Sequence, residues 1–481
     1  MNTRIIALAS LLTLGMTAVT QAQDLFQPPQ QYFTDLQTFG VAVGDVNGDG
    51  RKDVVTTGCC VVPGPVHKLY VFLQQPDHML SPTPTVYQTQ SMSGSVAIGD
   101  VTGDGRPDIV GSGFNGIEVI PQNAAGGLDP SIFYPSNYFD EARVGDLNGD
   151  GHLDVIALTD SIDGHINADA AGVFLQNPSG SLDLPVTVPL PHGFNDDIEL
   201  ADLNNDGRTD VVVVNPFNQP AIVILYQTAS GTLSAPVTLS IGPGILAQQV
   251  AVGDIDHDGR KDLVVSYGGY VTDVHLAIFH QNADGSFAAP VLLGSPDFLT
   301  AVEIADANND GLQDIVLLHQ STLGVILQNA DGTLAPETSI ALPPAGGHYQ
   351  LGLVAADING DGMTDIAYSQ VGSQGALTVL YGKVPPPPAN HPPVAVADRA
   401  TVVCDGTVTI AVRANDSDPD GDALAITAVS KPANGSAKLT ADGKRVKYDP
   451  KSRFRGTDRF NYTISDGKGG TATATVTVTV R

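Results

Sequence analysis

One nine-residue pattern, Asp-x-(Asn/Asp/Thr)-x-Asp-Gly-x-x-Asp, occurs seven times in the 481 residues of this chain. The spacing between copies ranges from 46 residues (Asp100 to Asp146) to 56 residues (Asp146 to Asp202). The copies, numbered here as loops 1 to 7, begin at Asp45, Asp100, Asp146, Asp202, Asp254, Asp306 and Asp357. A repeat of this length matches one four-stranded blade of a β-propeller. The repeat therefore predicts a ring of seven similar units.

Each loop stands between two short runs that are rich in apolar and β-branched residues. An alternating run such as 41–43 enters the loop, and an apolar run such as 210–213 leaves it. A third run (221–225), a Gly-containing turn and a last run with proline near its start (287–290) complete the unit. Runs of this kind, bounded by Gly, Asn and Asp, are typical of strands. We predict four antiparallel strands in each unit.

The ends of the repeat region predict how the ring closes. The seventh copy stops after its third run, 376–381, whereas the segment 25–29 resembles a fourth strand. If this segment completes the last blade, the ring has no open sheet edge. We therefore expect an all-β chain, in which a seven-bladed β-propeller with an N-terminal strand closing the last blade is followed by a small β-sandwich.

Four segments are expected along the chain. Residues 1–22 have the charged start, apolar run and small-residue cleavage site of a secretory signal peptide. The propeller is expected over 23–384, a stiff proline-rich linker over 385–393, and the β-sandwich over 394–481. No other apolar run suggests a membrane span. These features predict an exported protein that is secreted, periplasmic or at the cell surface.

The charge balance bears on the partners of the chain. Acidic residues outnumber basic residues by 52 to 23, which gives a net charge of −29. A broad basic surface is therefore excluded, and nucleic acid is not an expected partner. Three aspartates in each of the seven loops, together with Asp256, account for 22 of the carboxylates. Much of the negative charge is thus the expected signature of bound cations.

The loops have the donor pattern of a calcium site, because calcium takes about six to eight oxygen ligands with loose angles. Positions 1, 3 and 5 offer side-chain oxygens, position 7 offers its backbone carbonyl, and position 9 closes the shell. Position 7 varies freely, so its side chain is expected to play no part. We expect up to seven structural Ca²⁺ ions, held by Asp45, Asn47, Asp49, Arg51 and Asp53; Asp100, Thr102, Asp104, Arg106 and Asp108; Asp146, Asn148, Asp150, His152 and Asp154; Asp202, Asn204, Asp206, Arg208 and Asp210; Asp254, Asp256, Asp258, Arg260 and Asp262; Asp306, Asn308, Asp310, Leu312 and Asp314; and Asp357, Asn359, Asp361, Met363 and Asp365.

Position 6 is glycine in every copy, as a kink with positive φ requires. Runs of Asp, Asn and Gly also form solvated turns, but seven copies in register favour metal binding over that alternative. Loop 2 is expected to bind most weakly because Thr102 is a poor third ligand. Loop 5 is expected to bind most tightly because Asp256 adds a charge.

The loops and their strand settings resemble the FG-GAP/VCBS repeats of integrin α-subunit propellers and of many exported bacterial proteins. That resemblance implies calcium in a hairpin between the first two strands of each blade. The tail resembles bacterial cadherin-like Ig modules at 414–422, 448–450, 456–460, Tyr462 and 464–467. It implies either a calcium ion or a solvated turn at Asp416–Asp422.

Candidate contact residues at the opposite end of the blades are less regular. Aromatic residues recur eight positions before the loops and could stack on sugar rings or contact a protein partner, but inter-blade packing is the expected role because the position recurs in register. The set is Gln37, Met92, Tyr138, Phe194, Leu246, Phe298 and Tyr349. His192, Tyr267, Tyr270 and His348 are the better ligand candidates. Of the three cysteines, Cys59 and Cys60 are expected to be small apolar loop residues, with a strained ring between them as the alternative.

Two functions are compatible with these observations. The first is an exported, calcium-binding propeller that acts as a binding or adhesion module for a protein or glycan partner outside the cell. The alternative is a carbohydrate-active protein, either a lectin-like binder or a polysaccharide lyase or hydrolase, that uses the face opposite the calcium loops. No catalytic constellation is recognisable, so no catalytic residue is predicted and enzymatic activity is less expected than binding.

Overall fold

The structure, a computed structural model, describes residues 21–59, 66–113, 116–135, 139–159, 170–191, 197–214, 222–242, 245, 247–268, 275–294, 299–343, 349–371, 375–383 and 390–481. The chain divides into two compact units, residues 1–385 and 386–481. Of the expected signal peptide, only residues 21 and 22 are described, and they belong to the short helix α1 (Gln21–Leu25). Residues 385–389 of the expected linker also lie outside the described residues.

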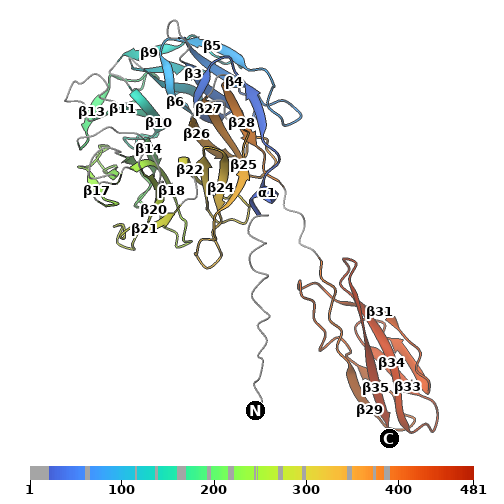
Figure 1. The fold of residues 1–481 in the computed structure, drawn as a ribbon. Helices are drawn as coiled ribbons and strands as arrows, with labels where there is room; N and C mark the ends of the chain where they lie inside the picture. The colour runs from blue at the N-terminus through green and yellow to red at the C-terminus, as the bar shows by residue number, and fades with distance from the viewer. Residues whose placement is uncertain are drawn as a thin grey trace, which may run out of the picture. The chain divides into compact units, whose positions relative to one another are not determined.

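The first unit is a ring of antiparallel four-stranded sheets (Figure 1). The described residues form seven such sheets, numbered here as blades by the loop that each contains. Blades 1 to 3 comprise β2 (Gln37–Gly44), β3 (Asp53–Cys59), β4 (His67–Phe72) and β5 (Thr85–Thr89); β6 (Met92–Gly99), β7 (Asp108–Gly113), β8 (Gly116–Ile120) and β9 (Ile132–Pro135); and β10 (Phe139–Gly145), β11 (Asp154–Thr159), β12 (Ala170–Phe174) and β13 (Val186–Pro189). Blades 4 to 6 comprise β14 (Asp197–Ala201), β15 (Asp210–Val214), β16 (Ile222–Leu225) and β17 (Val237–Leu239); β18 (Ala247–Gly253), β19 (Asp262–Tyr267), β20 (His275–Phe279) and β21 (Val291–Gly294); and β22 (Leu299–Ala305), β23 (Asp314–His319), β24 (Thr322–Ile326) and β25 (Thr338–Ala341).

Blade 7 is built from both ends of the propeller sequence. Its strands are β26 (Tyr349–Ala356), β27 (Asp365–Val371), β28 (Ala376–Leu380) and the N-terminal β1 (Gln30–Phe33), which pairs antiparallel with β28. The expected closure of the ring by an N-terminal strand is therefore confirmed. The segment 25–29 itself does not form the strand; its Phe26 makes an isolated bridge with Gly382, and the strand begins after Pro28 and Pro29.

The same displacement occurs in the other outer strands. The run 287–290, expected as a fourth strand, precedes β21, which begins at Val291 directly after Pro290. Proline has no backbone N–H to donate to a neighbouring strand, so strand pairing begins after it.

The core lies between successive sheets, because the second and third strands of each blade bury apolar side chains on both faces. In β15, for example, all five residues of the run Asp210–Val214 are buried, whereas the outer strand β5 is largely exposed. Separate hydrophobic clusters fill the spaces between neighbouring blades, such as the cluster of Val212 and Val265 between blades 4 and 5. The cluster that contains Val54, Phe72 and Val379 joins blade 1 to blade 7 and closes the ring.

The second unit is a β-sandwich with its own core. One sheet has the order β29-β35-β34-β31 and the other β30-β33-β32. The strands are β29 (Asp398–Val402), β30 (Val408–Ile410), β31 (Ala425–Val429), β32 (Gly435–Leu439), β33 (Val446–Pro450), β34 (Gly456–Ser465) and β35 (Thr471–Val480). Tyr448, Tyr462 and Val476 are fully buried between the sheets. The predicted all-β architecture is thus confirmed.

Candidate metal loops and the contacts that join them

The position-1 aspartate organises each of the seven loops. In every copy its Oδ1 accepts the backbone N–H of position 5 at 3.0–3.2 Å, and its Oδ2 accepts the N–H of position 6 at 2.8–3.0 Å. The loop therefore curls around one carboxylate. Backbone N–H groups are directed inward at this carboxylate, and a short polar side chain can form such a turn with its own backbone.

The backbone of the loops turns at two positions rather than one. All seven position-6 glycines have positive φ, between 80° and 88°, as expected from the sequence. Position 4 also has positive φ, and there Asn205, His257 and Asn309 replace glycine with φ of 56–60°. Position 4 could not be identified from the sequence, because its residue type varies among the copies.

The position-9 aspartate fastens each loop to the third strand of its own blade. It is 0% exposed in all seven copies. Its Oδ2 accepts the backbone N–H of position 2 at 2.9–3.3 Å, and its Oδ1 accepts an N–H just after the third strand at 2.7–3.1 Å. Burial raises the pKa of Asp53 and Asp154 to about 6 and that of Asp314 to about 7. A role of position 9 as a metal ligand remains a proposal.

The side chain at position 7 makes specific contacts in four loops, so the expectation that it plays no part is wrong there. In loops 1, 2, 4 and 5 this residue is arginine, and its Nη2 pairs with the position-5 aspartate of the same loop. Its Nε donates to a backbone carbonyl just after the third strand at 2.8–3.1 Å. The arginine therefore links the loop to the blade through two contacts that a planar guanidinium can make at once.

Loop 5 gathers the densest set of possible metal ligands. One carboxylate oxygen from each of Asp254, Asp256 and Asp258 lies within 4.8 Å of the others. Asp256, Asp262 and His280 form a second group in which one ligand atom of each residue lies within the same distance of the others. Asp256 Oδ1 is buried without a hydrogen-bond partner among the described residues. A buried, unpaired carboxylate oxygen is costly unless a cation or a proton satisfies it. This oxygen-rich donor set fits a hard cation such as calcium.

A glutamine just after the third strand ties each blade to the loop of the preceding blade. Its Nε2 donates to a backbone carbonyl of that loop in six blades, through Gln74, Gln122, Gln176, Gln227, Gln281 and Gln328. The Gln74 bond reaches Ile358 of blade 7 and thus crosses the ring closure. Between blades 6 and 7 the Thr364 hydroxyl donates to Asp306 O at 2.6 Å. These glutamines were missed by the sequence analysis, although their recurrence after the third strand was a usable signal.

The turn after the third strand packs on the same loop. At Gly126, an added Cβ would lie 2.7 Å from the backbone oxygen of Asn47 in the neighbouring blade. Gly126 also has φ of 79°, so both space and backbone conformation favour glycine there. The loops and these turns therefore lie at the same end of the blades, as expected.

A second group of charges lies on the innermost strands of the ring. The inner-strand charge cluster consists of Glu141 and Arg143 on β10, Asp197 and Glu199 on β14, and Glu303 on β22. Arg143 pairs with Glu141, with Glu199 at 3.2 Å and with Asp197 at 3.6 Å. Three carboxylates thus pair with one guanidinium, and Glu303 acts on it electrostatically without a direct pair. Burial raises the pKa of Asp197 to about 7 and that of Glu303 to about 8, and the nearby carboxylates add to the rise.

The candidates at the other end of the blades are described only in part. Met92 is fully buried in a cluster with Val55 and Leu69 of blade 1, which supports the expected inter-blade packing, and Gln37 begins β2 in a half-buried setting. Tyr267 is 7% exposed and therefore is a core residue more than a ligand contact. The side chain of Tyr349 and the residues Tyr138, His192, Phe194, Leu246, Tyr270, Phe298 and His348 lie outside the described residues.

The cysteines differ from expectation. Cys59, at the end of β3, is disulfide-bonded, whereas Cys404 is free. The expectation that Cys59 is an unpaired apolar loop residue is therefore wrong, because its sulfur is oxidised in a disulfide. Cys60 lies outside the described residues.

The acidic segment of the β-sandwich already has protein partners. One oxygen from each of Asp418, Asp420 and Asp422 lies within 4.8 Å of the others. Asp420 accepts from His391, and Asp422 pairs with Lys468 at 2.8 Å. Asp418 Oδ2 and Asp422 Oδ2 are nevertheless buried without a hydrogen-bond partner among the described residues, so the calcium ion and the solvated turn both stay predictions.

The repeat region matches a known family. Its FG-GAP-like repeat pattern is found at residues 45–111, 100–157, 146–213, 202–265 and 306–368, which together cover more than half of the chain. The chain belongs to the FG-GAP-like repeat family. A bacterial Ig domain matches residues 390–479 of this FG-GAP-like repeat protein, so the two resemblances stated from the sequence are confirmed.

Solved structures are similar to this FG-GAP-like repeat protein at low identity. BBS1N in its complex with ARL6DN is 11% identical, with a TM-score of 0.50 over 76% of this chain and 98% of that chain. A lectin from Agrocybe aegerita that recognises N-acetylglucosamine is 17% identical (TM-score 0.46, 63% of this chain and 80% of that chain). The Dos1 propeller is 10% identical (TM-score 0.44, 73% and 94%). No curated protein sequence matches the chain.

Within the part of the chain that the structure describes, no helix has the length and apolar character needed to cross a membrane.

Proposed function

We propose that this FG-GAP-like repeat protein is an exported binding module whose propeller is stabilised by calcium in its seven loops. The observation that carries the proposal is loop 5, where three carboxylates converge and Asp256 Oδ1 is buried without a protein partner among the described residues. The other six loops share its backbone geometry, so calcium fits each of them as well. Its affinity for each loop would depend on the side chain at position 3.

Calcium would supply charge neutralisation to the loops rather than a reactive centre. The side chains at positions 1, 3 and 5 and the carbonyl at position 7 would hold the ion, which leaves little coordination for a substrate. With dissociation constants of about 10⁻⁴ M, typical of extracellular sites, millimolar calcium would stabilise the fold by roughly 1.4 kcal/mol per site. Several sites together would rival the stability of an ordinary domain.

The ring architecture supports a binding role. The loops are tied to one another through the inter-blade glutamines, so calcium would hold a rigid scaffold on which the connecting segments at the other end present contacts. We propose that the partner is a protein or a glycan outside the cell, and that the Ig-like domain serves as a spacer or a second contact.

Calorimetric titration of the metal-stripped protein with calcium tests the metal part of this proposal. We expect at least five sites, and one site or none would contradict it. A glycan array tests the partner: saturable binding without turnover indicates a lectin-like module. Release of reducing or unsaturated sugars from a polysaccharide would replace the binding role with a catalytic one.

A further inference from the structure

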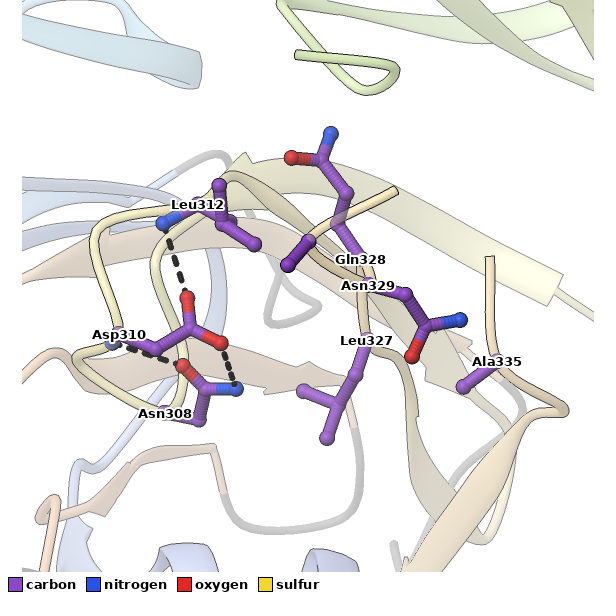
Figure 2. Close-up of a pocket in the computed structure, with 8 residues that line it drawn as sticks. Asn308, Asp310, Leu312, Leu327, Gln328, Asn329 and Ala335 are labelled. Atoms are coloured by element: carbon purple, nitrogen blue, oxygen red, sulfur yellow. Dashed lines mark hydrogen bonds between the residues drawn. The ribbon is translucent and has the colours of Figure 1, made fainter. Parts of the chain in front are cut away.

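Blade 6 has a hollow beside its metal loop. It has a volume of about 420 Å³ and lies between loop 6 and the segment after the third strand. Figure 2 shows Asn308, Asp310 and Leu312 on one side of it, and Leu327 and Asn329 on the other.

The same place in blades 1, 2, 4 and 5 contains the position-7 arginine of the chain itself. That guanidinium bridges two acceptors, the position-5 carboxylate and the backbone oxygen of the glutamine after the third strand, as Arg260 does with Asp258 and Gln281. In blade 6 position 7 is Leu312, which can donate to neither acceptor from its side chain. The acceptors themselves, the Asp310 carboxylate and the Gln328 backbone oxygen, are retained.

Neither retained acceptor is blocked by another group. Asp310 Oδ2 accepts from Asn308 Nδ2 at 2.9 Å, and the equivalent bond from Asn47 to Asp49 at 3.0 Å coexists with the Arg51 pair in blade 1. Within the described ranges, no donor bonds to the Gln328 backbone oxygen; the N–H and the side-chain amide of Gln328 donate to Asp314 and Asp254. Two other blades also lack the arginine: blade 3 carries His152 at position 7, and in blade 7 Gly382 packs against Met363.

The chemistry of this place selects one kind of group. Its polar lining offers the Asp310 carboxylate and the Gln328 carbonyl as acceptors, while Leu312, Leu327 and Ala335 supply apolar contact for an aliphatic stem. The amide nitrogens of Asn308 and Asn329, which also line it, already donate to Asp310 and Thr333. A guanidinium can donate to both acceptors at once from a planar fork, whereas an ammonium is a more strongly hydrated point charge. We propose that this guanidinium slot, defined by Asp310, Leu312, Leu327 and the backbone of Gln328, binds an arginine side chain of a partner protein. This inference rests on the proposed binding function, and it adds that the partner contributes an arginine side chain.

Methyl NMR of the full chain with labelled leucines, in saturating calcium, tests the slot directly. Nα-acetyl-arginine methylamide is expected to shift the Leu312 and Leu327 methyl signals saturably, whereas the norleucine analogue is not. Leu312→Arg should restore the internal bridge and weaken the apparent affinity about tenfold or more, which corresponds to about 1.4 kcal/mol. Leu312→Met leaves the slot open and should bind as the wild type does.

The reverse substitution provides an independent check. Arg260→Leu should create a further slot in blade 5 and raise the number of bound probes by one. Equal shifts with the norleucine analogue, unchanged binding by Leu312→Arg, or no saturable shift would each overturn the proposal. Tighter binding of an arginine-containing peptide than of agmatine identifies a protein source of the guanidinium, and the opposite order identifies a small molecule.

A calcium melting curve on the same samples separates the two proposals. Loss of calcium stabilisation counts against the proposed function, whereas loss of the arginine response alone counts against the slot.

Discussion

At the scale of single residues, the loops combine two demands on the same carboxylates. The position-5 aspartate pairs with arginine at position 7 in four loops, and in the proposed calcium sites it would also offer an oxygen to the cation. The role of the position-6 glycines could be predicted because a positive φ restricts the residue type. The role of the arginines could not, because a backbone ligand at position 7 explained the variation among Arg, His, Leu and Met equally well.

Loop 5 should depend on its position-5 aspartate more than loop 2 does. Asp258→Ala removes one of three convergent carboxylates, whereas Asp104→Ala acts on a loop whose third ligand is Thr102. We expect the calcium-saturated melting temperature to fall by about 2–4 °C for Asp258→Ala and by less for Asp104→Ala. Asp284→Ala, in an exposed turn of the same blade, serves as the control; it removes only the two hydrogen bonds from Ser286 and should lower the melting temperature less than Asp258→Ala does. The reverse order of the two loop variants in differential scanning calorimetry would contradict this ranking.

At the scale of the blade, strand identity was predictable and strand ends were less so. The apolar runs after each loop became buried second strands because both faces pack against neighbouring sheets. The outer strands began later than expected because proline cannot donate to a neighbouring strand. The inter-blade glutamines escaped prediction because their partners lie in another blade, 77 residues away for Gln122 and Asp45.

Gln122→Leu should destabilise the contact between blades 1 and 2. Its Nε2 bond to Asp45 O, at 3.1 Å, would be lost from a side chain that is only 1% exposed. We expect a loss of about 1–2 kcal/mol in the free energy of unfolding and weaker calcium binding in loop 1. Denaturant unfolding measures the first effect and calorimetry the second. Gln88→Leu, on the exposed outer strand β5, is the matched control, and equal stability of the two variants would show that the bond contributes nothing.

At the scale of the whole molecule, ring closure brings together charges that the sequence separates widely. Arg143 and Glu303 belong to blades 3 and 6, and only the innermost strands of a closed ring can place them in one cluster. The period of the loops predicted the ring, but the inward direction of these particular side chains depends on the tilt and register of each first strand. For this reason the cluster could not be foreseen.

The inner-strand charge cluster predicts a pH dependence of stability. Because the folded pKa values of Asp197 and Glu303, about 7 and about 8, exceed the ordinary range, the folded protein retains protons that the unfolded chain releases. The contribution of these two carboxyl groups to the free energy of unfolding is therefore most favourable below the ordinary carboxyl pKa, and it becomes unfavourable as the pH rises to about 8. We expect Glu303→Gln to raise the melting temperature at about pH 8.5 and to leave it unchanged at about pH 4.5. The loop carboxylates titrate equally in both proteins, so their effect cancels in the comparison. The exposed Asp77→Asn variant is the control, and a difference that does not change with pH would contradict the assignment.

The central claim is that cations in the loops hold the ring of blades together. Its most direct test is the melting temperature of the full chain measured by scanning calorimetry in millimolar calcium, in magnesium and in excess chelator. We predict that calcium raises the propeller transition well above that in chelator, that magnesium does so much less, and that the transition of the Ig-like domain barely moves. A propeller transition at the same temperature in calcium and in chelator would contradict the account.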